Sequence, residues 1–124
     1  NGAVPMPRRC EMKRVSLTTK PMLFADIKKS LRKVGVGGVT ITETSGYGRQ
    51  GGHVELYRGA EYVVDLVPKI TVEILVSDDQ VESLIDAVLS VCGAAGIGAG
   101  KLWITPVSDT VRIRTGERGE SAIA

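Results

Sequence analysis

The residues with the clearest capacity for chemistry are glycines that stand next to cationic side chains. Gly96, Gly98 and Gly100 directly precede Lys101. Glycines at this spacing let backbone N–H groups approach an anion, and the adjacent lysine supplies positive charge. The stretch from Gly98 to Lys101 matches neither a Walker loop nor a dinucleotide-binding fingerprint, so an ordinary turn remains an alternative interpretation.

A second set of glycines and three arginines extend this hypothesis to a polyphosphate. The glycines bracket a β-branched segment and are Gly35, Gly37, Gly38, Gly46 and Gly48. Arg49, Arg112 and Arg114 could complete a cage of cations with Lys101, since guanidinium groups bind phosphate oxygens in a bidentate manner. Arg112 and Arg114 are expected on one face of a strand, where they could equally be surface charges.

Catalytic chemistry has little support in this sequence. His53 is the single histidine and lies among loop glycines, without a serine or cysteine obviously paired to it. Cys10 and Cys92 are far apart and lack a histidine at metal-ligand spacing, so no site of three or four ligands can be assembled. We therefore expect a protein that is not an enzyme.

Length and composition limit the remaining classes of function. A chain of 124 residues makes one domain, and a net charge of +2 is too small to indicate nucleic-acid binding. No apolar run approaches the roughly 20 residues that cross a bilayer, and Asn1–Pro7 lacks the apolar stretch of a signal peptide. We expect residues 1–11 to be a disordered tail or tag residue, residues 12–124 to form the domain, and the protein to be cytoplasmic, with a plastid location left open.

The first half of the chain predicts a strand, a helix, a second strand and a long loop. Lys13–Thr19 alternates as a half-buried strand does. Leu23–Val34 carries apolar residues at helical spacing, and Gly35 ends that helix. Val36–Ser45 is β-branched and alternating, whereas Gly46–Gly59 loses its apolar rhythm and is predicted to be a loop.

The second half repeats this pattern. Tyr62–Val76 is strand-like with a bend or edge position at Pro68, and Ser77-Asp78-Asp79 offers N-cap chemistry to a second helix. Its apolar stripe consists of Val81, Leu84, Ile85, Val88, Leu89 and Cys92. A glycine-rich loop, Gly93–Gly100, leads to the strand Lys101–Thr105, and a further strand is expected over Thr110–Ile113.

Two strand-helix-strand units in tandem predict an α+β, ferredoxin-like βαββαβ fold with helices on one face of an antiparallel sheet. The other face must then be covered by something else. Ile70–Val76 contains enough apolar residues to suggest a subunit interface, so we expect a homo-oligomer.

Three ordered motifs resemble the PII signal transduction family. Gly46–Tyr62 is similar to its long T-loop, and Tyr57–Tyr62 (YRGAEY) is the most specific part of the match. Gly98–Trp103 resembles its B-loop, and Val111–Glu117 resembles its C-terminal ending. The resemblance runs without gaps from about Met12 to Ala124.

The resemblance implies a homotrimer that binds ATP or ADP competitively in clefts between subunits. The positions that match the family's nucleotide ligands are Gly38, Val39, Thr40, Gly46, Tyr47, Gly48, Arg49, Gln50, Glu73, Leu75, Gly98, Ala99, Gly100, Lys101, Arg112 and Arg114. Gln50 would join the ATP phosphates around Mg²⁺, and the metal would then chelate 2-oxoglutarate. The positions implied for that metabolite are Arg49, Gln50, Gly51, Gly52 and Lys69.

The output implied by the family is regulation of nitrogen and carbon metabolism through the T-loop. Its targets would be an ammonium transporter, a metabolic enzyme or a nucleotidylyltransferase. Tyr62 matches the tyrosine that receives a nucleotidyl group in some members, although it could instead pack on a neighbouring subunit.

Departures from the family pattern lie mainly in the B-loop. Ala94, Gly96 and Ala99 replace a hydroxyl residue, a lysine and an aspartate, and Thr18 replaces an apolar residue near the base pocket. These changes favour one of two alternatives to the sensor, the first of the following. One is a degenerate PII-like adaptor with an altered nucleotide response, controlling a bicarbonate or other transporter. The other is a small ferredoxin-like enzyme with slow ATP hydrolysis, which the lack of a credible base argues against.

Overall fold

The computed structural model describes residues 11–47, 53–57, 60–64 and 66–123, and for 53–57 and 60–64 it describes only the backbone. The strands are β1 (Met12–Thr19), β2 (Thr40–Gly46), β3 (His53–Tyr57), β4 (Ala60–Val64), β5 (Val67–Ser77) and β6 (Lys101–Val107). The α-helices are α1 (Phe24–Lys33) and α2 (Val81–Cys92). Short 3₁₀ helices are η1 (Pro21–Leu23), η2 (Asp78–Gln80), η3 (Gly93–Ala95) and η4 (Gly119–Ala122).

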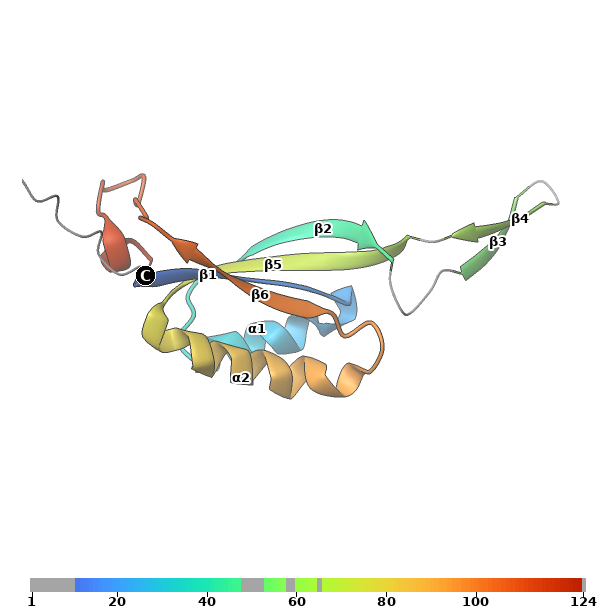
Figure 1. Ribbon diagram of the computed structural model, residues 1–124, viewed down its shortest axis with the longest axis horizontal. Helices are drawn as coiled ribbons and strands as arrows, with labels where there is room; N and C mark the ends of the chain where they lie inside the picture. Colours follow the sequence, from blue (N-terminus) through green and yellow to red (C-terminus); the bar gives the residue numbers. More distant parts are fainter. Residues whose placement is uncertain (1–10, 48–52, 58–59, 65, 124) are drawn as a thin grey trace, which may run out of the picture.

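Four strands form an antiparallel sheet in the order β2-β5-β1-β6. Both α-helices cover one face of this sheet, as Figure 1 shows. In the register of the central strands, Val15 lies opposite Ile74 on one side and Ile104 on the other. The ferredoxin-like fold predicted from the order of elements is confirmed.

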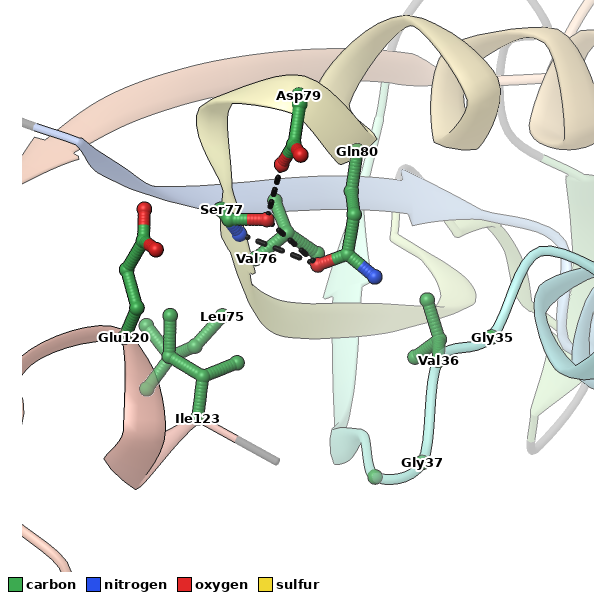
Figure 2. A pocket seen from close by; sticks show the side chains of 11 residues that line it. Gly35, Val36, Gly37, Leu75, Val76, Ser77, Asp79, Gln80, Glu120 and Ile123 are labelled. Atoms are coloured by element: carbon green, nitrogen blue, oxygen red, sulfur yellow. Dashed lines mark hydrogen bonds between the residues drawn. The ribbon is translucent and has the colours of Figure 1, made fainter.

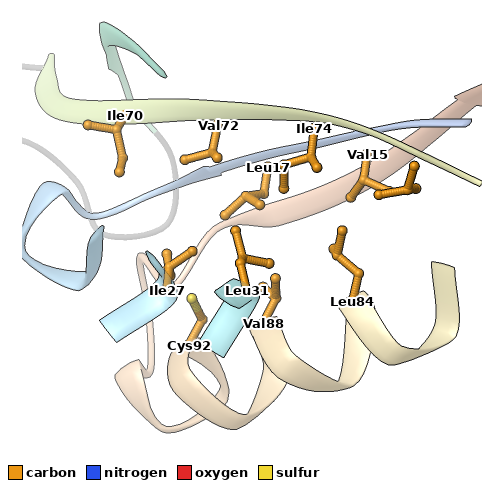
Figure 3. Packing of buried hydrophobic residues seen from close by; sticks show 11 residues of the cluster. Val15, Leu17, Ile27, Leu31, Ile70, Val72, Ile74, Leu84, Val88 and Cys92 are labelled. Carbon is orange, nitrogen blue, oxygen red and sulfur yellow. The ribbon is translucent and has the colours of Figure 1, made fainter. Parts of the chain in front are cut away.

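The core lies between this sheet and the two helices (Figure 3). Alternate side chains of β1 and β5 meet Ile27 and Leu31 of α1 and Leu84 and Val88 of α2. The prediction that Leu89 belongs to the buried apolar stripe of α2 is wrong, because this residue is 59 % exposed. The buried line of α2 runs through Leu84, Val88 and Cys92, which are four residues apart, and Leu89 lies about 100° away from Val88.

The apolar residues of β5 that suggested a subunit interface are mostly buried in the core of the same chain. Ile70, Val72, Ile74 and Val76 are buried, because side chains two residues apart share one face of a strand. The remaining apolar side chain of that segment, Leu75, is 40 % exposed. The four buried side chains are therefore not accessible to a second subunit and give no support to an oligomer.

The predicted ends of the helices are confirmed. Gly35 has φ = +86°, a conformation that glycine adopts without steric cost after a helix. Ser77 forms a capping box, in which its backbone N–H donates to Gln80 Oε1 at 3.2 Å. This box joins β5 directly to η2 and α2.

Two strand predictions on the first half of the chain need correction. β2 begins at Thr40 and not at Val36, because the pair Gly37-Gly38 weakens strand formation there. The predicted loop Gly46–Gly59 contains β3, which pairs with β4 as a separate two-stranded sheet. β-branched and aromatic residues in both segments explain this pairing, and Figure 1 shows the two strands beyond the end of the main sheet.

The last predicted strand, Thr110–Ile113, is also wrong. Val111 makes a single bridge with Arg118, and the chain between them folds back through Gly116, whose φ is +77°. β6 continues through Pro106 to Val107, and an edge strand tolerates proline because one side of its backbone has no partner strand. Among the helices that the structure describes, none is long and apolar enough to cross a membrane.

Candidate functional site

The predicted site residues separate into two groups at opposite ends of the main sheet. The first group lies where β2 ends and β6 begins, and its described members are Gly46, Tyr47, Lys69, Gly98, Ala99, Gly100 and Lys101. The second group lies toward the other end, and its members are Gly38, Val39, Thr40, Glu73, Leu75, Arg112 and Arg114. A strand rises about 3.3 Å per residue, so the two ends of β2 lie about 20 Å apart.

All described members of the first group line one cleft with a volume of about 730 Å³. Thr18, Gly96, Ile97 and Trp103 complete its lining. Lys69 and Lys101 give the cleft positive charge, and two aromatic side chains are accessible there, Tyr47 at 77 % and Trp103 at 45 % exposed. Cations, exposed rings and a glycine loop together suit a ligand that has an anionic and a planar part.

The loop between α2 and β6, residues 93–100, forms one side of this cleft. Side chains from other parts of the chain donate hydrogen bonds to its carbonyl oxygens. The Thr19 hydroxyl donates to the carbonyl oxygen of Ala99 at 2.6 Å. Lys20 Nζ donates to Ala95 O at 3.2 Å, and Lys69 Nζ lies 3.5 Å from Gly98 O. The loop is also closed by a turn, since Ala99 N–H donates to Gly96 O at 3.0 Å.

Gly100 is the position where this loop depends most on glycine. Its φ is +104°, and an added Cβ would lie 1.7 Å from the carbonyl oxygen of Thr18. No side chain fits at that distance from a backbone oxygen. Glycine at position 100 therefore allows the backbone before β6 to pack closely against the backbone at the end of β1.

Thr18, which replaces an apolar residue of the family pattern, lies in the lining of the cleft. Its Oγ1 lies 3.1 Å from Thr71 Oγ1, so the two hydroxyls share a hydrogen bond across neighbouring strands. The surface of β1 that lines the cleft is therefore more polar at Thr18 than it would be with an apolar side chain.

Two members of the second group line a smaller hollow of about 360 Å³ (Figure 2). Gly38 belongs to the connection from α1 to β2, and Leu75 belongs to β5. Figure 2 shows Glu120 and Ile123, from the C-terminal segment, across this hollow from the glycine connection. Thr40 lies opposite Glu73 in the sheet, and Glu73 Oε2 is 3.9 Å from a guanidinium nitrogen of Arg14.

The two arginines of the second group differ in their surroundings. Arg112 Nη1 donates to Glu117 Oε1 at 3.1 Å, and its Nη2 donates to Ser121 O at 3.2 Å. The expectation that Arg112 and Arg114 share one face of a strand is wrong, because the chain turns between Arg112 and Glu117. Arg114 lies within this turn and is exposed.

Several predicted site residues lie outside the described residues. These are Gly48, Arg49, Gln50, Gly51 and Gly52, and for Tyr62 the backbone in β4 is described but the side chain is not. Among the described residues, no three of the types His, Cys, Asp and Glu gather as a metal site.

Comparison with known proteins decides the family. The sequence model described as nitrogen regulatory protein P-II matches residues 12–117 of the chain. The chain belongs to the PII family. The nitrogen regulatory protein P-II of Azospirillum brasilense is 48 % identical over 112 residues, which are 90 % of this chain and 100 % of that protein. The protein of the same description from Cereibacter sphaeroides is 46 % identical over the same shares of both chains.

Solved structures of PII proteins have the same fold. Arabidopsis thaliana PII bound to citrate is 32 % identical with a TM-score of 0.75, over 93 % of this chain and 92 % of that one. The B. subtilis GlnK–ATP complex is 28 % identical with a TM-score of 0.72, over 90 % of this chain and 94 % of that one. The chain is therefore a member of a family of signal transduction proteins.

Within this PII chain, sequence reasoning missed two residues that shape the first cleft. Thr19 and Lys20 hold carbonyl groups of the loop that lies about 75–80 positions later in the chain. Lys20-Pro21 was expected only to end the first strand. No local pattern signals these contacts, because they depend on the register between β1 and β6.

Proposed function

We propose that this PII-family chain is a non-enzymatic sensor that binds ATP or ADP in clefts shared by adjacent subunits of a homotrimer. The observation that carries the proposal is that the predicted ligands lie in two groups toward opposite ends of the main sheet, where their members on β2, Thr40 and Gly46, are about 20 Å apart. A second copy that supplied the second group would bring both groups to one nucleotide. The similarity of this chain to B. subtilis GlnK, which was solved as a complex with ATP, supports a nucleotide as the ligand.

The proposed roles follow from the chemistry of each group. In one subunit, backbone amides of the loop Gly98–Gly100, together with Gly46, Tyr47 and Gly48, approach the phosphates, and Lys101 and Arg49 neutralise them. In the neighbouring subunit, Arg112 and Arg114 supply further positive charge. Gly38, Val39, Thr40, Glu73 and Leu75 form the facing wall.

Mg²⁺ and 2-oxoglutarate are the finer part of this proposal. The described residues offer no metal-binding cluster of their own, so nucleotide phosphates and Gln50 would hold the ion. When bound, Mg²⁺ would give two coordination positions to the keto acid of 2-oxoglutarate. Arg49, Gly51 and Gly52 would surround that metabolite, and Lys69 would pair with its far carboxylate, exchanging its contact with Gly98 O.

In this proposal the T-loop transmits the signal to a partner, and it contains β3 and the start of β4. A T-loop that is held by metal, ATP and 2-oxoglutarate differs in shape from one released with ADP, and partners that bind one shape are coupled to metabolic state. The partner would be an ammonium transporter, a metabolic enzyme or a nucleotidylyltransferase acting at Tyr62.

The experiment that tests the shared cleft is complementation between two variants. Lys101→Ala and Arg112→Ala each damage a different wall, so each purified variant should bind ATP weakly by calorimetry. Mixed trimers made by co-expression contain some clefts with both walls intact, and high-affinity sites should reappear. Mixed oligomers with no recovery, or a monomer by sedimentation, would contradict the shared site.

A second experiment separates the metabolite response from nucleotide binding. Gln50→Ala should lose 2-oxoglutarate binding in the presence of ATP and Mg²⁺ while ADP binding stays nearly unchanged. Equal loss of both ligands would show that the roles are assigned wrongly.

The alternative function is a PII-like adaptor with an altered nucleotide response, for example one that controls a bicarbonate transporter. The alanines and glycine at 94, 96 and 99 favour it, because they leave the loop without charged or hydroxyl side chains. A T-loop partner that binds equally well with and without adenine nucleotides would support this alternative.

A further inference from the structure

The last residue of β1, Thr19, has an unusual position for a hydroxyl. Its side chain is 1 % exposed and lies beneath the loop 93–100 that borders the cleft. The hydroxyl donates to Ala99 O at 2.6 Å and lies 3.9 Å from the buried Cys92 Sγ. A buried hydroxyl without a partner is costly, so the short bond to Ala99 O favours the orientation in which this carbonyl points to Thr19.

The direction of the Ala99 carbonyl also sets the direction of the next amide. A trans peptide is planar and places its C=O and N–H on opposite sides, and the chain contains no cis peptide bond in its described part. Because Ala99 O points to Thr19, the N–H of Gly100 points away from Thr19. Gly100 itself lies so close to the carbonyl of Thr18 that an added Cβ would be 1.7 Å from that oxygen.

Phosphate binding needs such an arrangement, since carbonyl oxygens repel an anion and amides attract it. Lys20 and Lys69 also draw carbonyl groups of this loop toward their own side chains, those of Ala95 and Gly98. The bond from Thr19 is the shortest of the three. It is also the bond to the Ala99 carbonyl, which shares a peptide unit with the N–H of Gly100, the residue before Lys101.

We propose that Thr19 is a positioning residue for nucleotide binding: its buried hydroxyl turns the Ala99–Gly100 peptide so that the Gly100 N–H faces the phosphates. The inference rests on the proposed function. Thr19 itself does not touch the nucleotide, so its effect passes through the loop.

The test compares Thr19→Val with Thr19→Ser in the full chain. Valine keeps the shape and removes the donor, and we expect ATP and ADP affinities, measured by calorimetry, to fall roughly tenfold. Serine keeps the donor and should stay within about twofold of the original affinity. Amide hydrogen exchange at Gly100 and Lys101 in nucleotide-free protein should be faster in Thr19→Val and unchanged in Thr19→Ser.

A matched control is Ser16→Ala in the same strand. The Ser16 side chain is also 1 % exposed, but its hydroxyl has no hydrogen-bond partner among the described residues. Removal of this hydroxyl should leave nucleotide affinity and loop exchange unchanged.

Two results would overturn the proposal. One is a Thr19→Val protein with unchanged affinity and exchange, and the other is a Thr19→Ser protein that loses as much as the valine variant. If the original protein binds no adenine nucleotide, the proposed function fails while the exchange rates still decide whether Thr19 directs the loop.

Discussion

The loop 93–100 and the C-terminal segment 108–123 belong to the two groups of predicted nucleotide ligands, and they are prepared for an anion in different ways. In the loop, side chains of the same chain bind carbonyl oxygens. In the C-terminal segment, carboxylates of the same chain bind the guanidinium groups, as Glu117 does for Arg112 and Asp109 does for Arg118. A phosphate would therefore meet preset amides in the first region and would compete with carboxylates in the second.

This difference indicates which region is rigid in the free chain and which one responds to a ligand. Exposed ion pairs contribute about 0–1 kcal/mol, so a phosphate can displace them at small cost. A buried hydrogen bond and a backbone contact at Gly100 cannot be exchanged so easily. In the proposed site, the loop would supply a fixed wall and the C-terminal segment would supply an adjustable one.

The largest expected effect is at Gly100. In Gly100→Ala, the new Cβ would collide with Thr18 O, and we expect the free energy of unfolding to fall by about 3 kcal/mol or more with loss of nucleotide binding. The control is Gly116→Ala in the C-terminal segment, where φ is +77° but no atom lies within 4 Å of the added Cβ. It should cost about 1–2 kcal/mol, and denaturant unfolding measures both. Equal losses would remove the distinction between a fixed and an adjustable region.

Arg112→Ala should have the next largest effect. Loss of a charged hydrogen bond to phosphate is expected to weaken ATP and ADP alike by about 1.5–3 kcal/mol, which calorimetry measures. The free energy of unfolding should change much less, because the present partners of Arg112 are exposed. A variant that binds both nucleotides normally would exclude Arg112 from the site.

Glu117→Gln should change nucleotide affinity in the opposite direction, that is, raise it. Without the carboxylate, Arg112 loses a competitor of the phosphate, so nucleotide affinity should rise by up to about 1 kcal/mol. Asp109→Asn is the matched control, since it removes the other ion pair of the segment and should leave affinity unchanged. Reduced affinity in Glu117→Gln would mean that Glu117 orients Arg112 and does not compete.

The smallest effect concerns stability at low pH. The side-chain hydrogen bond from Arg118, followed by the backbone N–H of Thr110, lowers the pKa of Asp109 below its ordinary value of 3.8. A depressed pKa means that this contact stabilises the fold above the ordinary pKa and that the contribution is lost as the pH falls through the folded-state value. The urea midpoint of Asp109→Asn should be slightly below that of the original protein at pH 7. The two midpoints should converge as the pH falls below the folded-state pKa of Asp109, and a constant gap would show that the charge of Asp109 has no part in the difference.

Local patterns predicted the elements whose signals lie within a few residues. The helix end at Gly35, the cap at Ser77 and the order of the four main-sheet strands and two helices follow from such signals. The bridge between Val111 and Arg118 and the pairing of β3 with β4 were missed, because β-branched residues there compete with turn residues. The family resemblance located the first cleft, whereas the role of Thr19 depends on contacts about 80 positions apart and needed the structure.

Because Cys92 lies beneath the loop, alkylation of its thiol can be used to measure how often the loop separates from α2. Burial raises the pKa of this thiol, and the adjacent Thr19 hydroxyl partly lowers it. A buried neutral thiol reacts slowly with alkylating reagents, so iodoacetamide would label it mainly when the end of α2 and the loop separate. In a Cys10→Ser background, the rate of slow labelling would report the population of the open form, and any compound that holds the cleft closed would lower it.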